Sequence, residues 1–220
     1  MRDGWRLCFM VAMLSLTITS CQARVSKSVE SSDVEPLSPR AQSSVTHTKN
    51  HPSFRDLARE VGVQCKDLDR GEGCMAQDDT DPHAADYFDV ELHPGCDEWG
   101  MYGGVIAAQG AELANRLPPM DTKVNAILSK GQFVCIRAIA RVGQSISRYY
   151  VTAVPISGVT GCRDNKLCRV YGDRSIRFAS PAVSPCRLDR SGLNGDCASG
   201  WATEGSLEVF SLGLHGEDSE

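Results

Sequence analysis

Long hydrophobic runs, runs of basic residues and aromatic side chains are all scarce in this sequence of 220 residues. No run of Lys or Arg reaches five, and the net charge is -5, so the footprint of a nucleic-acid-binding segment is missing. No apolar stretch approaches the roughly 20 residues of a membrane-spanning helix. The hydrophobic content of 41% is nevertheless enough for the hydrophobic core of a folded domain. We therefore expect one or two small folded domains with no nucleic-acid partner.

Sequence patterns typical of catalytic and metal sites are also missing. The cysteines form no C-x-x-C pair and their spacing fits no zinc finger. Gly143–Ser147 approaches the G-x-S-x-G motif but has no glycine at its last position. The acidic stretch Asp78–His83 lacks the Gly and Glu of an EF-hand loop and reads as a solvated turn. We expect no metal, no cofactor and no catalytic residues, and hence a binding protein rather than an enzyme.

Cysteine, in contrast, is abundant, with ten residues in the chain. Such a number indicates disulfides in an exported protein, and metal binding or redox chemistry in a cytosolic one. The N-terminus favours export. Arg2 and Arg6 precede an apolar run, Leu7–Ile18, whose length of about a dozen residues is typical of a signal peptide.

The end of that apolar run, Ile18-Thr19-Ser20-Cys21, resembles the bacterial lipobox. The resemblance implies a signal peptide over residues 1–20 and a lipid attached to the Cys21 thiol. Two or three acyl chains would hold the protein firmly at a membrane, whereas one chain holds only marginally. Gln22, which is not Asp, then implies a periplasm-facing position at the outer membrane. The alternative is plain secretion after cleavage behind Ala23.

Residues 21–52 predict a flexible tether, because Ser, Thr, Val and single charges alternate there without an apolar period. A domain is expected over residues 53–220. It begins with a short helix over 54–61, since Phe54, Leu57, Ala58 and Val61 share one helical face. Ser53 is placed to cap the start of this helix, and Gly62 to end it.

The rest of the domain is predicted to be mainly β. Short alternating or β-rich segments recur about every ten residues between Gly and Pro punctuation, as in a small barrel or sandwich. The expected strands lie at 86–92, 103–108, 132–140, 148–154, 167–171, 175–178 and 207–212.

Residues 104–154 resemble a divergent bacterial SH3-like (SH3b) domain. Leu113–Pro118 stands where that family has its "LNVRSGP" segment, and Val124–Val134 is similar to "VIGTLKKGTKV". Tyr149-Tyr150-Val151 occupies the place of "WYKV". Leu117 and Tyr149 depart from the pattern. The resemblance implies a small SH3-like barrel with disulfide-stapled extensions, which binds cell-wall peptides or proteins. An unrelated cysteine-stapled β domain remains the alternative.

Without Cys8 and Cys21, eight cysteines remain for the domain, an even number that predicts four disulfides. Many connectivities are open to eight cysteines. Short loops favour Cys65–Cys74, Cys162–Cys168 and Cys186–Cys197, which leaves Cys96–Cys135.

Because aromatic residues are few, their positions suggest a ligand surface. Adjacent residues on a strand face opposite ways, so one of two neighbouring tyrosines is expected to be exposed. The expected ligand-binding residues are Trp99, Tyr102, Asn115, Arg116, Tyr149 and Tyr150. The sequence thus favours a membrane-anchored lipoprotein that binds peptidoglycan or an envelope protein. Alternatives are an immunity or inhibitor lipoprotein that blocks a cell-wall hydrolase and, less favoured, an envelope hydrolase.

Overall fold

The computed structural model describes residues 53–76, 88–96, 100–118, 122–189, 192–210 and 214. The chain divides into a unit of residues 1–45 and a unit of residues 46–220, and all described residues belong to the second. The expected signal peptide, the lipobox with Cys21, the tether over 21–52 and Trp99 lie outside the described residues. No helix among those residues is both long and apolar enough to cross a membrane.

The first element is the helix α1, Phe54–Val61, and it confirms the prediction at both ends. The Ser53 hydroxyl accepts a hydrogen bond from the main-chain N–H of Asp56 at 3.1 Å. Gly62 ends the helix with φ of 74°, a left-handed conformation that glycine adopts without steric cost. The helix buries Leu57, Ala58 and Val61.

The domain is mainly β, as predicted. Its strands are β1 (Gln64–Asp67), β2 (Glu72–Ala76), β3 (Phe88–Leu92), β4 (Met101–Val105), β5 (Ala111–Ala114), β6 (Val124–Leu128), β7 (Phe133–Val142), β8 (Ser145–Ala153), β9 (Ile176–Phe178), β10 (Arg187–Asp189), β11 (Gly192–Asn194), β12 (Ser199–Thr203) and β13 (Leu207–Phe210). Three single turns of 3-10 helix lie at Ile156–Gly158 (η1), Thr160–Cys162 (η2) and Glu204–Ser206 (η3).

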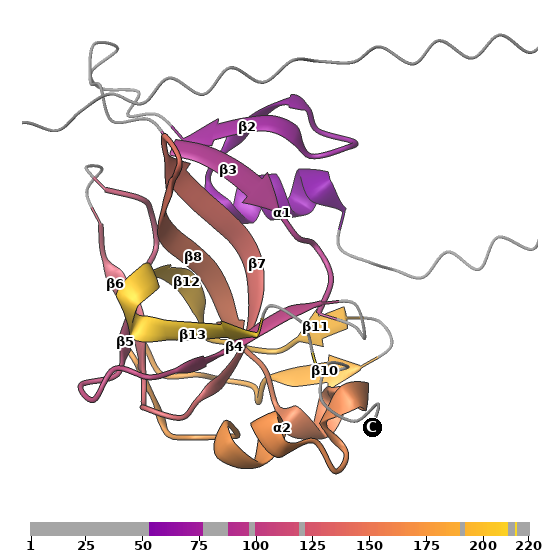
Figure 1. Ribbon diagram of the computed structural model, residues 1–220, viewed down its shortest axis with the longest axis vertical. Helices are drawn as coiled ribbons and strands as arrows, with labels where there is room; N and C mark the ends of the chain where they lie inside the picture. The colour runs from indigo at the N-terminus through magenta and orange to yellow at the C-terminus, as the bar shows by residue number, and fades with distance from the viewer. Residues whose placement is uncertain are drawn as a thin grey trace, which may run out of the picture. The chain divides into compact units, whose positions relative to one another are not determined.

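The large sheet is open. Its strand order is β1-β2-β3-β7-β8-β12-β5-β6-β9, and β4 and β13 branch from β7. In the part of the chain that the structure describes, no strand pairing joins β9 back to β1, so the expected small barrel is not closed. Strand β7, with ten residues, pairs with β4 along its first half and with β3 along its second half. The sheet therefore splits into two branches at this edge of β7 (Figure 1).

A second correction concerns 167–171, where a strand was expected. The structure has a short helix, α2 (Lys166–Val170), instead. The side chain of Asn165 accepts a hydrogen bond from the N–H of Leu167 at 2.8 Å and so caps its start. The disulfide Cys162–Cys168 holds the same segment, and these local contacts outweigh the β-like pattern of the sequence.

Strand β7 is buried on both faces. Val134, Ile136 and Ile139 point into one core, while Phe133 and Cys135 point into a second core, beside α2. The second half of the opposite face, Ala138 and Ala140, packs in a third core with α1 and β1–β3. The pairing with β8 shifts register between Ile136 and Ala138, as a β-bulge does. Burial on both faces explains why this strand reads as a nearly continuous hydrophobic run.

Four disulfides join the eight cysteines of the domain, in the three pairs that short loops favour and the one pair that these leave over. Cys65–Cys74 links neighbouring strands β1 and β2, and Cys96–Cys135 ties the segment after β3 to β7. Cys162–Cys168 joins η2 to α2. The fourth, Cys186–Cys197, closes the base of a small separate hairpin of β10 and β11.

Candidate functional site

The three expected ligand-binding tyrosines that the structure describes are buried rather than exposed. Tyr102, Tyr149 and Tyr150 keep 1%, 6% and 5% of their surface exposed. Tyr149 and Tyr150 do face opposite ways, but each enters a different core because β8, like β7, is covered on both sides. The expectation that one of the pair offers an open ring is therefore wrong.

Tyr150 belongs to a polar cluster that fastens α1 to the sheet. Its hydroxyl donates to Glu60 Oε1 at 3.2 Å, and Arg137 Nη1 lies 2.8 Å from both oxygens of the same carboxylate. Burial, together with the nearby charge of Glu60, raises the pKa of Tyr150 above its ordinary value. Trp201 adds a hydrogen bond from its indole N–H to the Val61 carbonyl at 3.3 Å. These partners hold a helix in place, which is a structural role.

The polar residues of the expected ligand set do not join the tyrosines. The Asn115 side chain accepts a hydrogen bond from the main-chain N–H of Lys123 at 2.7 Å. The main-chain N–H of Asn115 donates to the Lys123 carbonyl at 2.9 Å. Asn115 thus closes the loop between β5 and β6. Arg116 is exposed at the start of that loop. The described members of the set therefore form no common surface.

A different segment stands out from the domain. All nine residues of 177–185 are exposed, and we call this segment the projecting loop; its first two residues, Arg177 and Phe178, end strand β9. At its end Val183 keeps 94% of its surface open, the largest exposure among the large hydrophobic side chains of the described residues. Full burial of a valine side chain is worth about 1.5 kcal/mol or more, which this residue forgoes in the free protein.

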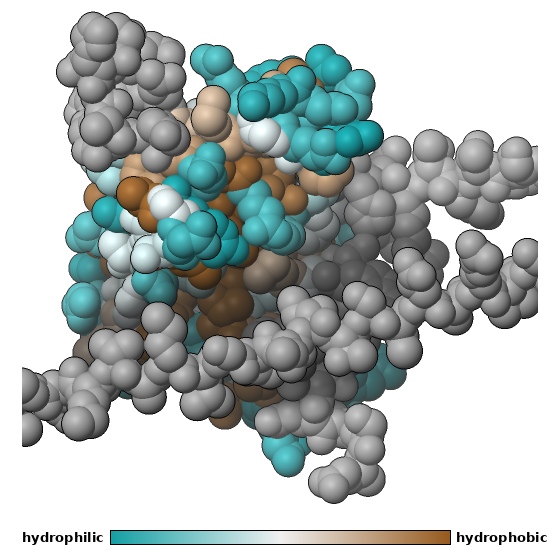
Figure 2. Space-filling view, turned by 45° about the horizontal axis from the view of Figure 1, so that its top comes forward, coloured by the Kyte–Doolittle hydropathy of each residue, from teal (hydrophilic) through white to brown (hydrophobic). Residues whose placement is uncertain are grey.

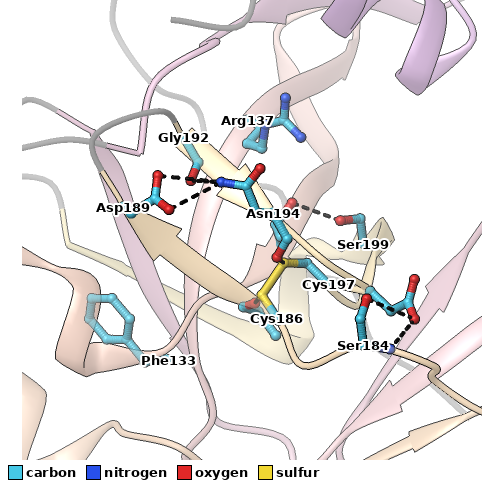
Figure 3. Close-up of a disulfide and its surroundings, with 12 residues drawn as sticks. Phe133, Arg137, Ser184, Cys186, Asp189, Gly192, Asn194, Cys197 and Ser199 are labelled. Atoms are coloured by element: carbon cyan, nitrogen blue, oxygen red, sulfur yellow. Dashed lines mark hydrogen bonds between the residues drawn. A yellow bond between two sulfur atoms is a disulfide. The ribbon is translucent and has the colours of Figure 1, made fainter. Parts of the chain in front are cut away.

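Specific contacts hold the projecting loop in its conformation. The carboxylate of Asp196 accepts hydrogen bonds from the main-chain N–H groups of Val183 at 2.6 Å and Ser184 at 2.8 Å. These bonds, that of Ser184 foremost, hold the pKa of Asp196 below its ordinary value. The disulfide Cys186–Cys197 fixes the end of the loop immediately beyond Pro185 (Figure 3).

The hairpin behind the disulfide is itself docked on the domain. Leu188 and Leu193 face each other across β10 and β11 and pack against the core beside α2. The Asn194 side chain donates to Asp189 Oδ1 at 3.3 Å and to the Gly192 carbonyl at 3.2 Å, which closes the hairpin end (Figure 3). The projecting loop consequently rises from a fixed base.

Close backbone approach at Gly195 completes this base. A Cβ atom at Gly195 would lie 2.2 Å from the Pro185 carbonyl oxygen, and the residue has φ of 81°. Only glycine meets both demands. The sequence signals of the site were thus Pro181, Pro185 and Asn194-Gly195, which mark turns but do not by themselves indicate a projecting loop.

The projecting loop offers groups for contact with another molecule. Within the described residues, no three His, Cys, Asp or Glu side chains are grouped so as to hold a metal ion. The loop offers an open aliphatic side chain, exposed main chain and a fixed shape, which is a combination suited to fitting a surface of another molecule. No protein-family model, no curated protein and no solved structure matches this chain.

Proposed function

We propose that this chain is a lipid-anchored envelope protein that binds a protein partner through the projecting loop, residues 177–185. The observation that carries the proposal is the exposure of Val183 on a loop held by Asp196 and by the Cys186–Cys197 disulfide. Ordering a loop on binding costs free energy, and a loop that is already ordered avoids much of that cost. A partner that covers Val183 also gains the burial that the free protein forgoes.

The other expected ligand, peptidoglycan, has less support than a protein partner. Glycan binding usually relies on open aromatic ring faces, and the described tyrosines and Trp201 are buried. Phe178, with 37% of its surface exposed, is the one large exposed aromatic side chain among the described residues. The polar and apolar surface of the projecting loop suits a protein better.

The proposed setting follows from the sequence. Lipid on Cys21 would tie the protein to the outer membrane on its periplasmic side, and residues 21–52 would give the domain room to reach a partner. An oxidising compartment suits the four disulfides. Labelling with radioactive palmitate should mark the chain and fail to mark Cys21→Ala. A wild-type chain without label, or a labelled Cys21→Ala variant, contradicts the anchor.

An SH3-like relationship for residues 104–154 also remains part of the proposal. In its support, β5, β6, β7 and β8 follow one another over this range, and β5–β6 and β7–β8 pair as antiparallel neighbours. Such a module would serve as the scaffold, and the projecting loop would be an addition that follows it in the chain.

Site-specific photocrosslinking in living cells tests the partner-binding role directly. A photoreactive phenylalanine derivative replaces Val183 in one full-length chain and the exposed Lys123 in a control chain. We expect an adduct of one discrete mass from position 183 and none from position 123, and mass spectrometry then identifies the partner. Adducts at neither position, or equally at both, contradict the proposal.

The fixed loop also supports a narrower version, in which the partner is a cell-wall hydrolase and the chain is its inhibitor. A projecting, preordered loop is suited to entering a concave site, the usual form of an enzyme's substrate pocket. The photocrosslinked partner distinguishes the two versions. If it is a hydrolase, adding the purified chain should lower the activity of the hydrolase on isolated cell walls. The Val183→Asp chain, added in the same amount, should leave that activity unchanged.

A further inference from the structure

A second surface of the domain carries a charge opposite to that of the whole chain. Residues 159–178 contain five basic and two acidic side chains, although the net charge of the chain is -5. Lys130, the basic residues of α2 and β9, and Arg174 between these two elements are exposed. We call the set of Lys130, Lys166, Arg169, Arg174 and Arg177 the basic corner.

Direct contacts bring the central members of the basic corner together. Arg174 Nη2 donates to the Val170 carbonyl at the end of α2, at 3.3 Å. The same guanidinium lies over the turn after β6, where a Cβ atom on Gly131 would be 3.1 Å from Arg174 Nε. Arg174 therefore connects the end of α2 with the turn that carries Lys130. Lys166 and Arg169 are three residues apart on α2 and so are neighbours on its surface.

The basic corner differs from the opposite end of the domain in how its charges are compensated. Around α1 and β2, Arg55 pairs with Asp69 at 2.9 Å and Arg70 pairs with Glu72 at 2.6 Å. Figure 2 shows hydrophilic residues at the upper right of its view and further ones over its centre and left side. Among the described residues, no member of the basic corner lies within ion-pair distance of a carboxylate.

The acidic groups close to the basic corner are few and partly engaged. Asp173 accepts a hydrogen bond from the N–H of Ile156 at 3.1 Å, and Glu208 accepts one from the Tyr171 hydroxyl. Asp164 is exposed next to α2, and its main-chain carbonyl accepts a hydrogen bond from Arg169. The corner thus keeps an excess of positive charge.

An exposed apolar side chain lies beside several of these charges. Val170 is 62% exposed, four residues after Lys166 and directly after Arg169. Basic side chains around an exposed aliphatic residue match the interface of an anionic bilayer, where the charges meet headgroups and the apolar group enters the acyl boundary. We propose that the basic corner binds the surface of a membrane rich in anionic lipid headgroups.

This inference is separate from the proposed partner binding, because it does not involve Val183 and needs no acyl anchor; Arg177 alone belongs to both surfaces. Each Lys or Arg close to an anionic surface strengthens binding about fivefold. The binding should therefore be weak for the free chain, and it would orient a domain that another device already keeps near the membrane.

The test uses the chain from Gln22 onward, which has no Cys21 to acylate. It is sedimented with vesicles of phosphatidylcholine alone, or with vesicles in which about a third of the lipid is phosphatidylglycerol. We expect binding to the anionic vesicles only, with loss at high salt because screening weakens exposed charges. The affinity of the double variant Lys130→Glu and Lys166→Glu for the anionic vesicles should be lower by about tenfold or more.

The matched control is the double variant Lys66→Glu and Lys123→Glu, which changes the net charge equally at exposed lysines outside the corner. It should bind anionic vesicles nearly as the wild type does. Val170→Ser should weaken binding to anionic vesicles at low salt, since it removes the apolar contact and leaves every charge in place. Polyglutamate, a soluble polyanion, serves as a competitor.

Several outcomes would overturn the proposal. One is no binding to anionic vesicles; another is equal loss in both double variants, which would reflect net charge only. A third is tight binding of polyglutamate without vesicle binding, which would assign the basic corner to an acidic protein instead. Circular dichroism of each variant checks that the β fold is retained.

Discussion

The carboxylate of Asp196 lies 2.6 Å from the main-chain nitrogen of Val183, the most exposed large hydrophobic residue described, and fixes it in place. These two residues are 13 positions apart and are brought together across the Cys186–Cys197 disulfide. The contact gives the exposed loop a fixed conformation.

Replacing Asp196 should loosen the projecting loop without unfolding the domain. Asp196→Ala removes the acceptor of two main-chain N–H groups on an exposed segment, so we expect at least several-fold faster cleavage within 177–185 by a nonspecific protease. Limited proteolysis with mass spectrometry measures the rate. Asp173→Ala, which removes the acceptor of one N–H near η1, is the control and should leave cleavage at the loop unchanged. Similar cleavage of wild type and Asp196→Ala would show that the contact does not order the loop.

The same contact should depend on pH. The pKa of Asp196 is lower in the folded protein than its ordinary value near 4, so its hydrogen bonds favour the ordered loop above that value. That contribution is lost as the pH falls through the lowered pKa, so the loop should stay ordered at neutral pH and loosen only below about pH 4. The amide NMR shifts of Val183 and Ser184 report the change. If Asp196→Asn shows the same acid transition, another group is responsible.

A negative charge at position 183 of the projecting loop should weaken partner binding. Val183→Asp places a carboxylate where the partner would bury an aliphatic side chain, so the affinity for the photocrosslinked partner should fall by about tenfold or more. Stability should change by no more than about 0.5 kcal/mol because the side chain is exposed. Val124→Asp, at a site that is 40% exposed, is the matched control and should bind normally. Equal binding by Val183→Asp and wild type would remove the loop from the interface.

The four disulfides should differ in their contribution to stability according to the loops they close. Cys96–Cys135 spans 39 residues and Cys162–Cys168 spans 6. Chain-entropy estimates give about 4 kcal/mol for the first and about 2 kcal/mol for the second. Replacement of both cysteines by Ala at each pair, followed by urea unfolding, measures the two losses. A larger loss at Cys162–Cys168 would mean that local strain or packing outweighs chain entropy.

Local rules predicted some elements from the residues alone. The α1 helix was predictable because its cap, its apolar spacing and its terminal glycine all lie within a few residues of one another. The disulfide pairs followed from short separations along the chain. The segment 167–171 was misread because the Asn165 cap and the nearby disulfide compete with a β-like pattern there.

The candidate site was largely beyond the reach of the sequence. Adjacent Tyr149 and Tyr150 imply opposite faces, which is correct, but the sequence does not tell that both faces of β8 are covered. The Tyr150 side packs in a cluster with α1 and β3, and the Tyr149 side packs in a cluster with residues of β5 and β6, all of which come from other parts of the chain. Similarly, Val183 reads as an ordinary apolar residue, and only the partner across the disulfide, Asp196, shows that it is held outward.

The sequence by itself determined the helix α1, the mainly β class and an even set of cysteines, since each rests on local periodicity, capping or short loop closure. Only the tertiary structure decided that β7 divides the sheet into two branches, that the tyrosines are core residues, and that 177–185 projects from the domain. These depend on contacts between residues far apart in the chain, and their free energies are set by which surfaces meet.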